Sequence, residues 1–226
     1  MMNKSFVSGC LLVFCSCVLM AQEQKGKSIL LKMHKRYQKG PCQSYTFSQK
    51  NKHYRNDSVV RQTEWHEAVE FPDKFTIVFG DSANGNRVVF RNDSALHFRK
   101  NGLMKAMPDS NNLLLMLGGM YYRKFDDVAA RLNKAGYDLS GLSEEIWGGR
   151  EVYVIGSSDS LANRIWVDKK DLRIVRIVER MNENEMMDLR FEAFQPWCRG
   201  YVETKVSFRR NGKLEQEEEY FDLRKR

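Results

Sequence analysis

Hydrophobic and polar residues alternate with a period of two over most of this chain, which is the pattern of half-buried β-strands. In the clearest run, 74–79, Phe75, Ile77 and Phe79 fall on one face. Turn-forming pairs such as Asn101-Gly102 and Asn211-Gly212 separate neighbouring runs, which predicts antiparallel connections. We expect strands over residues 44–54, 59–70, 74–79, 87–91, 95–99, 151–155, 164–167, 172–180, 185–194, 201–209 and 214–221.

Helical spacing replaces this alternation in three segments. The first, 28–37, precedes the first expected strand, and the other two lie between Pro108 and Gly136. Asp109 or Ser110 can cap the first mid-chain helix, which is apolar nearly all round. Its apolar residues are Leu113, Leu114, Leu115, Met116, Leu117 and Met120. The second mid-chain helix, 125–135, is amphipathic, so the chain is predicted to be mainly β, in the α+β class.

A sheet of about ten or eleven strands is too large to stay flat, so we expect it to curve strongly and leave a concave face. That hollow must be covered or filled, because a large exposed apolar surface is a liability unless it serves binding. The apolar mid-chain helix can do this in two ways: as a core helix packed permanently on the sheet, or as a lid over a cavity. Gly118-Gly119 would weaken the end of this helix by about 1 kcal/mol each.

The N-terminus has the features of a secretory signal peptide. Residues 6–20 are apolar, follow Lys4 and end before Ala21 and a polar stretch. A transmembrane helix needs about 20 apolar residues, and this run is shorter. We therefore predict that residues 1–21 are removed and that 22–226 form one exported domain. Cys10 ends a lipobox-like stretch, but the apolar run follows it instead of preceding it, so a lipid-anchored form is less favoured.

The chain is basic, with a formal net charge of +8 at pH 7. Removal of residues 1–21 takes away one lysine and no acid, which leaves +7. A basic surface can meet nucleic acid, anionic lipid headgroups or acidic proteins, and export makes nucleic acid the least expected of these. We expect both the acidic run 215–219 and the basic tail 224–226 to be solvated.

Two of the five cysteines, Cys42 and Cys198, remain after removal of the signal peptide. An oxidising compartment would allow a disulfide between them. The alternative is two unrelated buried thiols.

The second half of the chain carries more specific motifs, namely 136–140, 146–156 with Gly149-Arg150-Glu151-Val152-Tyr153, 164–169 with Trp166-Val167-Asp168-Lys169, and 172–176. This stretch resembles the outer-membrane lipoprotein-carrier and lipoprotein-sorting (LolA-like) superfamily. In that superfamily the two motifs lie on paired strands, and a tight turn follows the second. Upstream, 71–75 is similar to the superfamily's Pro-containing entry into a strand. The likeness in element order covers about 28–222.

The resemblance implies an incomplete antiparallel barrel, with the N-terminal helix and the two mid-chain helices as its lid, that holds acyl chains in the periplasm. It also implies that Arg61 is a candidate for a positively charged latch. The candidate cavity residues are Phe47, Trp65, Val69, Phe75, Ile77, Phe79, Leu96 and Phe98, and the candidate lid residues are the six apolar residues of the first mid-chain helix. Whether each faces a cavity or an ordinary core stays open, because parity fixes only the face.

Catalytic and metal-binding chemistry is not indicated. The four histidines show no spacing typical of a metal site, and Gly80 to Gly85 lacks the Gly-Lys-Ser/Thr of a phosphate loop. We expect a non-enzymatic, monomeric periplasmic protein without cofactor that shields a lipid or lipoprotein acyl chain and meets a membrane receptor or envelope protein. The alternatives are an envelope-stress regulatory module that signals to a protein partner, a solid scaffold and, least favoured, a hydrolase.

Overall fold

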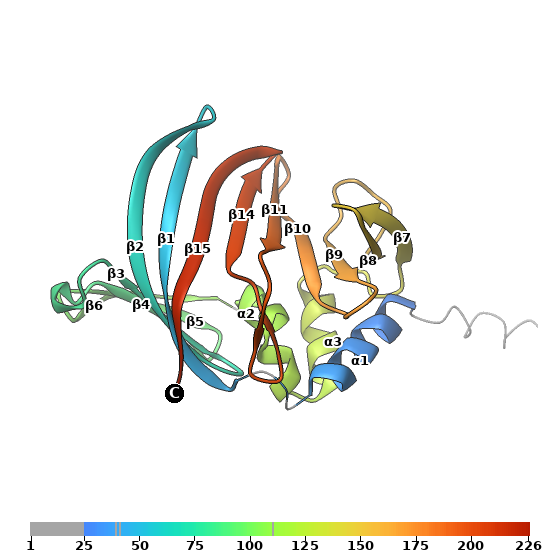
Figure 1. Ribbon diagram of the computed structural model, residues 1–226, viewed down its shortest axis with the longest axis horizontal. Coiled ribbons are helices and arrows are strands. Elements are labelled where there is room, and N and C mark those ends of the chain that lie inside the picture. The colour runs from blue at the N-terminus through green and yellow to red at the C-terminus, as the bar shows by residue number, and fades with distance from the viewer. Residues whose placement is uncertain (1–24, 39, 41, 110) are drawn as a thin grey trace, which may run out of the picture.

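The computed structural model describes residues 25–38, 40, 42–109 and 111–226, so the predicted signal peptide lies outside the described residues. A single curved sheet of thirteen strands dominates this part of the chain (Figure 1). In hydrogen-bonding order the strands are β6 (Gly102–Pro108), β5 (Ser94–Arg99), β4 (Arg87–Arg91), β3 (Lys74–Phe79), β2 (Ser58–Glu70), β1 (Ser44–Arg55), β15 (Lys213–Lys225), β14 (Lys205–Arg210), β11 (Glu185–Glu192), β10 (Ile174–Asn182), β9 (Arg164–Asp168), β8 (Arg150–Ile155) and β7 (Leu142–Trp147).

The sheet joins two meanders and stays open. Strands β1 to β6 form one meander and β7 to β15 the other, and they meet where β1 pairs antiparallel with β15. Strands β6 and β7 are the two free edges among the described residues, so the sheet curves without closing into a barrel. This confirms the predicted mainly β fold with an incomplete barrel.

Strands β6 and β7 are absent from the predicted set, and the reason is burial. Every residue of β6 is exposed, and β7 has four exposed residues in its middle. Neither strand therefore carries an alternation of apolar and polar residues. The predicted strand 201–209 is wrong as one element, because β13 (Gly200–Val202) pairs with β12 (Gln195–Trp197) in a separate hairpin before β14 begins.

The helices are α1 (Lys25–Tyr37), α2 (Asn112–Leu117) and α3 (Phe125–Lys134), with a 3₁₀ turn, η3 (Gly119–Tyr122), after α2. Figure 1 shows α1 and α3 beside the β8 to β10 strands, and α2 closer to the middle of the sheet, below β14 and β11. Asn111 caps α2, since its side chain accepts a hydrogen bond of 2.9 Å from the Leu114 amide. The predicted cap at Asp109 is therefore wrong, and the alternative, Ser110, lies outside the described residues. Helix α2 ends at Leu117, where the glycine pair begins. Within the described residues, no helix combines the length and the apolar character that crossing a membrane requires.

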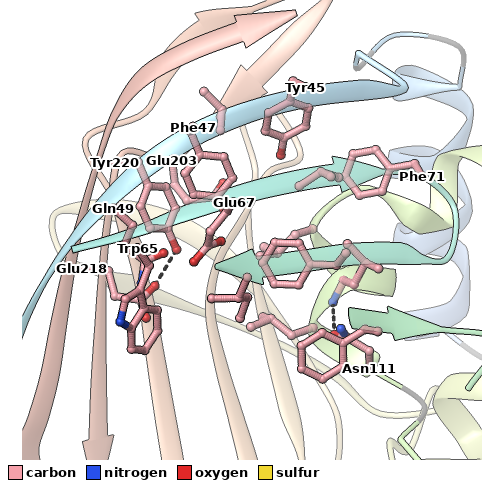
Figure 2. Close-up of a pocket in the computed structure, with 18 of the residues that line it drawn as sticks. Tyr45, Phe47, Gln49, Trp65, Glu67, Phe71, Asn111, Glu203, Glu218 and Tyr220 are labelled. Atoms are coloured by element: carbon pink, nitrogen blue, oxygen red, sulfur yellow. Dashed lines mark hydrogen bonds between the residues drawn. The ribbon is translucent and has the colours of Figure 1, made fainter. Parts of the chain in front are cut away.

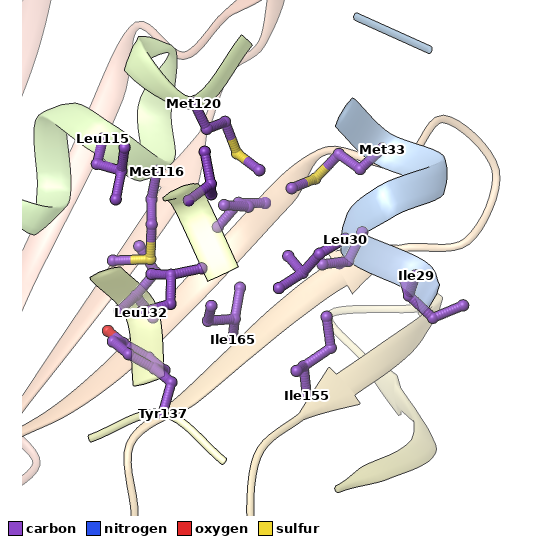
Figure 3. Close-up of a cluster of buried hydrophobic side chains, with 14 of the residues drawn as sticks. Ile29, Leu30, Met33, Leu115, Met116, Met120, Leu132, Tyr137, Ile155 and Ile165 are labelled. Atoms are coloured by element: carbon purple, nitrogen blue, oxygen red, sulfur yellow. The ribbon is translucent and has the colours of Figure 1, made fainter. Parts of the chain in front are cut away.

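The main hydrophobic core lies between the helices and the β8 to β11 strands (Figure 3). Helix α1 contributes Leu30 and Met33, and α3 contributes Leu132, each almost fully buried. Ile165 and Ile155 face them from β9 and β8. This packing leaves the concave face of β1 to β3 without an equivalent covering helix, and that face forms the site described next.

Candidate ligand-binding pocket

A pocket with a volume of about 450 Å³ lies between α2 and the concave face of β1, β2, β3 and β15. Its walls follow the period of two along each strand, because alternate residues share a face. The wall from the strands contains Tyr45, Phe47 and Gln49 (β1), Trp65, Glu67 and Val69 (β2), Phe75 and Ile77 (β3), Phe90 (β4), Glu179 (β10), Phe208 (β14), and Glu218 and Tyr220 (β15). Strand β13 adds Val202, and loops and α2 add Phe71, Asp109, Asn111, Asn112, Leu113, Leu114, Leu117 and Glu203.

Five of the predicted cavity residues lie in this lining, namely Phe47, Trp65, Val69, Phe75 and Ile77. The other three, Phe79, Leu96 and Phe98, lie outside it. Phe79 packs its ring edge-on against Trp65 at 5.1 Å between centroids, and Phe98 lies under the Arg87 guanidinium at 4.3 Å. Leu96 is in β5, one strand beyond the last strand that reaches the pocket. Strand parity is therefore a guide to the face but not to how far along the sheet the hollow extends.

The predicted lid residues divide between two environments. Leu113, Leu114 and Leu117 line the pocket, whereas Leu115, Met116 and Met120 are buried in the main core. Helix α2 consequently covers the cavity with one face and packs in the main core with the other. Helices α1 and α3 also pack in the core, so of the helices that the structure describes only α2 contributes to the lining.

Aromatic side chains make up much of the pocket wall. The Phe47 ring lies 4.7 Å from the Tyr220 ring and 5.9 Å from the Tyr45 ring. Phe75 and Phe90 stack at 5.9 Å on the opposite wall. Such pairs favour offset or tilted arrangements and give the pocket stiff, apolar sides.

Acidic side chains from distant parts of the chain also reach this apolar pocket. Figure 2 shows Glu67 and Glu218 beside Tyr220, with Glu203 behind. Glu218 is 6% exposed and accepts hydrogen bonds of 2.6 Å from the Tyr220 hydroxyl and from Gln216. Glu67 is 5% exposed and has no hydrogen-bond or ion-pair partner among the described residues.

Burial raises the pKa of each of these carboxyl groups. The pKa of Glu218 rises to about 7 because burial outweighs its hydrogen bonds from Tyr220, Gln216 and Gln49. The pKa of Glu203 also rises to about 7, through burial and the nearby Glu218. Burial and the charge of Glu218 raise the pKa of Glu67 well above its usual value.

This acidic group is absent from the residues predicted for the site. Glu67 lies between Trp65 and Val69 on the same strand face, so parity alone could have found it. The expectation that the run 215–219 is solvated is wrong at Glu218, because β15 turns 216, 218 and 220 toward the concave face.

Arg61, the candidate latch, is exposed and lies 3.3 Å from the His53 ring nitrogen, outside the pocket lining. In the part of the chain that the structure describes, no group of three or more His, Cys, Asp or Glu side chains is placed to hold a metal ion.

Cys42 and Cys198 form a disulfide, with 5.5 Å between their Cα atoms. That separation falls in the range that a disulfide bridges without backbone movement. The bond ties the segment between α1 and β1 to the β12–β13 hairpin, and the Arg199 amide donates to the Gly40 carbonyl beside it at 3.0 Å.

No protein-family model matches the sequence, and no curated protein matches it. Solved structures are similar in fold. A DUF1329 family protein from Desulfovibrio piger matches with a TM-score of 0.60 at 15% identity, over 88% of this chain and 91% of that one. A LolA superfamily protein from Nitrosomonas europaea matches with a TM-score of 0.57 at 11% identity, over 89% and 94%. An outer membrane lipoprotein-sorting protein domain from Vibrio parahaemolyticus matches with a TM-score of 0.57 at 14% identity, over 89% and 92%. The chain therefore has a LolA-like fold.

Proposed function

We propose that this protein is an exported, non-enzymatic binding protein that shields a lipid or lipoprotein acyl chain in the pocket and carries or senses it at the cell envelope. The observation that carries the proposal is the hollow of about 450 Å³ between α2 and the concave sheet. Ligand pockets commonly have volumes of about 300 to 1,000 Å³ and largely apolar walls.

The walls suit a hydrocarbon chain. Each CH₂ group that leaves water for such a wall contributes about 0.8 kcal/mol. Leu113, Leu114 and Leu117 offer flexible aliphatic contacts on the α2 side, opposite the aromatic rings of the strands. Two similar solved structures are named for the LolA superfamily or for lipoprotein sorting, which supports an acyl chain as the cargo.

We further propose that residues 1–21 are a cleaved signal peptide, that 22–226 act as one monomeric domain, and that the periplasm is its compartment. The Cys42–Cys198 disulfide supports export, because disulfides persist in oxidising compartments. Delivery or sensing of a lipid also requires a receptor or envelope protein, and the net positive charge favours approach to an anionic membrane surface.

The experiment is to narrow the pocket and measure acyl binding. Leu113 is partly buried at the pocket wall, so Leu113→Trp places a larger side chain into the space that the ligand would occupy. Overpacking of this kind costs about 1 to 3 kcal/mol, so binding of a fluorescent monoacylglycerol should weaken by about fivefold or more.

Leu161→Trp is the matched control, because Leu161 is 46% exposed and lies outside the lining. This variant should bind as the parent protein does. Equal affinity in both variants, or no binding by the parent protein after removal of co-purified lipid, would contradict the proposal.

A further inference from the structure

The pocket is acidic although the protein is basic. Its lining includes Glu67, Asp109, Glu179, Glu203 and Glu218, and among the described residues it includes no lysine, arginine or histidine. The whole chain carries a formal net charge of +8 at pH 7. The long-range field of the protein therefore favours an anionic ligand, whereas the pocket itself opposes one.

Glu67 is an acid of this lining whose side chain has no hydrogen-bond or ion-pair partner among the described residues. Buried carboxylates are normally paired or hydrogen-bonded, because an unpaired buried charge is costly. Three of the four titratable groups that face Glu67 are Glu218 and Tyr220 on β15 and Tyr45 on β1. The fourth, Glu203, lies between β13 and β14 and lines the same pocket. None of these four groups can carry a positive charge. The Glu67 side chain lines the open pocket, where a ligand can reach it (Figure 2).

The other walls show what kind of cation would fit. Aromatic rings attract an ammonium group over their faces, and Phe47, Trp65 and Tyr220 lie in the same part of the lining as Glu67. A hard metal ion takes several oxygen ligands and gains nothing from rings and leucines. An organic cation with a hydrocarbon chain uses both parts of the pocket.

We infer that the pocket takes a cationic amphiphile, an amine or quaternary ammonium group carrying an alkyl or acyl chain. The ammonium group lies against Glu67 and the aromatic rings, and the chain lies along the α2 leucines. This inference rests on the proposed function and names its ligand class.

Such a ligand makes binding depend on pH. Burial raises the pKa values of the Glu67, Glu203 and Glu218 carboxyls, to about 7 for Glu203 and Glu218, whereas a bound cation favours their ionised forms. Binding therefore releases protons, and affinity for the cation falls as pH drops below about 7.

The test compares three probes with one chain length, decyltrimethylammonium, decanoate and monodecanoylglycerol, by calorimetric titration of the delipidated protein at low salt and about pH 8. We expect the cation to bind about tenfold or more tighter than decanoate, and tighter than the neutral probe. Its advantage over the neutral probe should shrink at about pH 5.5.

The variant Glu67→Gln keeps the size of the side chain and removes the charge, so the preference for the cation should disappear while the neutral probe still binds. Glu64→Gln is the control, since Glu64 is exposed on the same strand and lies outside the lining. It should behave as the parent protein.

The outcomes separate the two proposals. If no probe binds the parent protein, the proposed function fails. If decanoate or the neutral probe binds as tightly as the cation, only the cationic ligand class is overturned. A preference that survives in Glu67→Gln also overturns it. The comparison of probes on the parent protein needs no variant, so it stands even if a substitution perturbs folding.

Discussion

The two halves of the sheet differ in how far helices cover their concave face. Strands β8 to β11 bury their concave face under α1 and α3, and Ile155, Ile165 and Ile177 have no exposed surface. The concave face of β1 to β3 combines aromatic and aliphatic side chains with the polar Gln49 and Glu67, and all six residues of β3 are only partly buried. The same alternation of residues thus gives a solid core in one half and a hollow in the other.

The position of the helices therefore decides which part of the concave face is filled and which part is hollow. Helix α1 packs on β8 and α3 packs on α1, so both belong to the solid half. Helix α3 touches the other half through the Arg131–Asp93 ion pair, whereas α2 lines its hollow, and α2 is a single short stretch of six residues, Asn112–Leu117. A helix of that length cannot fill the whole concave face of β1 to β3, and the space left over is the pocket.

The disulfide lies at the boundary between the halves, and its loss should have the largest effect. The bond spans 156 residues, and the chain-entropy model gives about 5 kcal/mol for a loop of this length. The double variant Cys42→Ser/Cys198→Ser should lose a comparable amount of unfolding free energy in urea denaturation. Hydrogen exchange should rise more in β1 and the β12–β13 hairpin than in β8 and β9.

The parent protein treated with a reductant is the control and should match the double variant. Mass measurement after alkylation that finds two free thiols in protein from its native compartment would rule out this role for the bond.

A pair of identical substitutions compares the halves directly. Leu132 has no exposed surface in the solid half, so Leu132→Ala should lower the free energy of unfolding by about 4 kcal/mol through the cavity it leaves. Leu113→Ala, in the pocket wall, should lower it by about 1 kcal/mol, because a hollow already adjoins that side chain. Both sites are helical, which keeps propensity effects equal. Equal losses in thermal and urea denaturation would show that the hollow half is packed as tightly as the other.

The acidic wall of the hollow half should make stability depend on pH. The pKa values of Glu67, Glu203 and Glu218 are raised in the folded state, those of Glu203 and Glu218 from 4.5 to about 7, so across that range the folded protein binds more protons than the unfolded chain. The free energy of unfolding should therefore fall as pH rises through this window. The fall is on the order of 3 kcal/mol, the value for one carboxyl raised to about 7.

Urea denaturation at about pH 5 and about pH 8 measures this fall. Glu67→Gln should reduce it and stabilise the protein at the higher pH, whereas Glu64→Gln, exposed on the same strand, should not. Asp188 has a lowered pKa beside Arg176 and Arg190, so its effect on stability appears below this window. Constant stability from pH 5 to pH 8 would mean that the carboxyls are not held in an apolar environment.

Much of the fold follows from local pattern. The predicted bounds of β3 and β4 agree with the structure, and α3 begins at the predicted Phe125. Their sequences carry the period of the element, which is two along the strands and helical along the amphipathic α3. Strand β6 could not be found this way, because both of its faces are exposed at a sheet edge.

The pocket could be predicted only in part. Parity placed Phe47, Trp65, Val69, Phe75 and Ile77 on one face, and these residues do line the hollow. The same rule put Phe79 on that face too, although Phe79 packs on Trp65 beyond the pocket, and it did not indicate the burial of Glu218 inside an acidic run. The acids of β2 and β15 become neighbours only when the ends of the chain pair through β1.

The sequence by itself determined which residues share a face of each strand and that the chain is mainly β, since alternation is a local consequence of backbone geometry. Only the tertiary structure decided which face is solid, which is hollow, and that Glu67 lies unpaired in the hollow. The physical reason is that burial depends on surfaces brought together from distant parts of the chain, and no local pattern records how completely a short helix such as α2 covers a curved sheet.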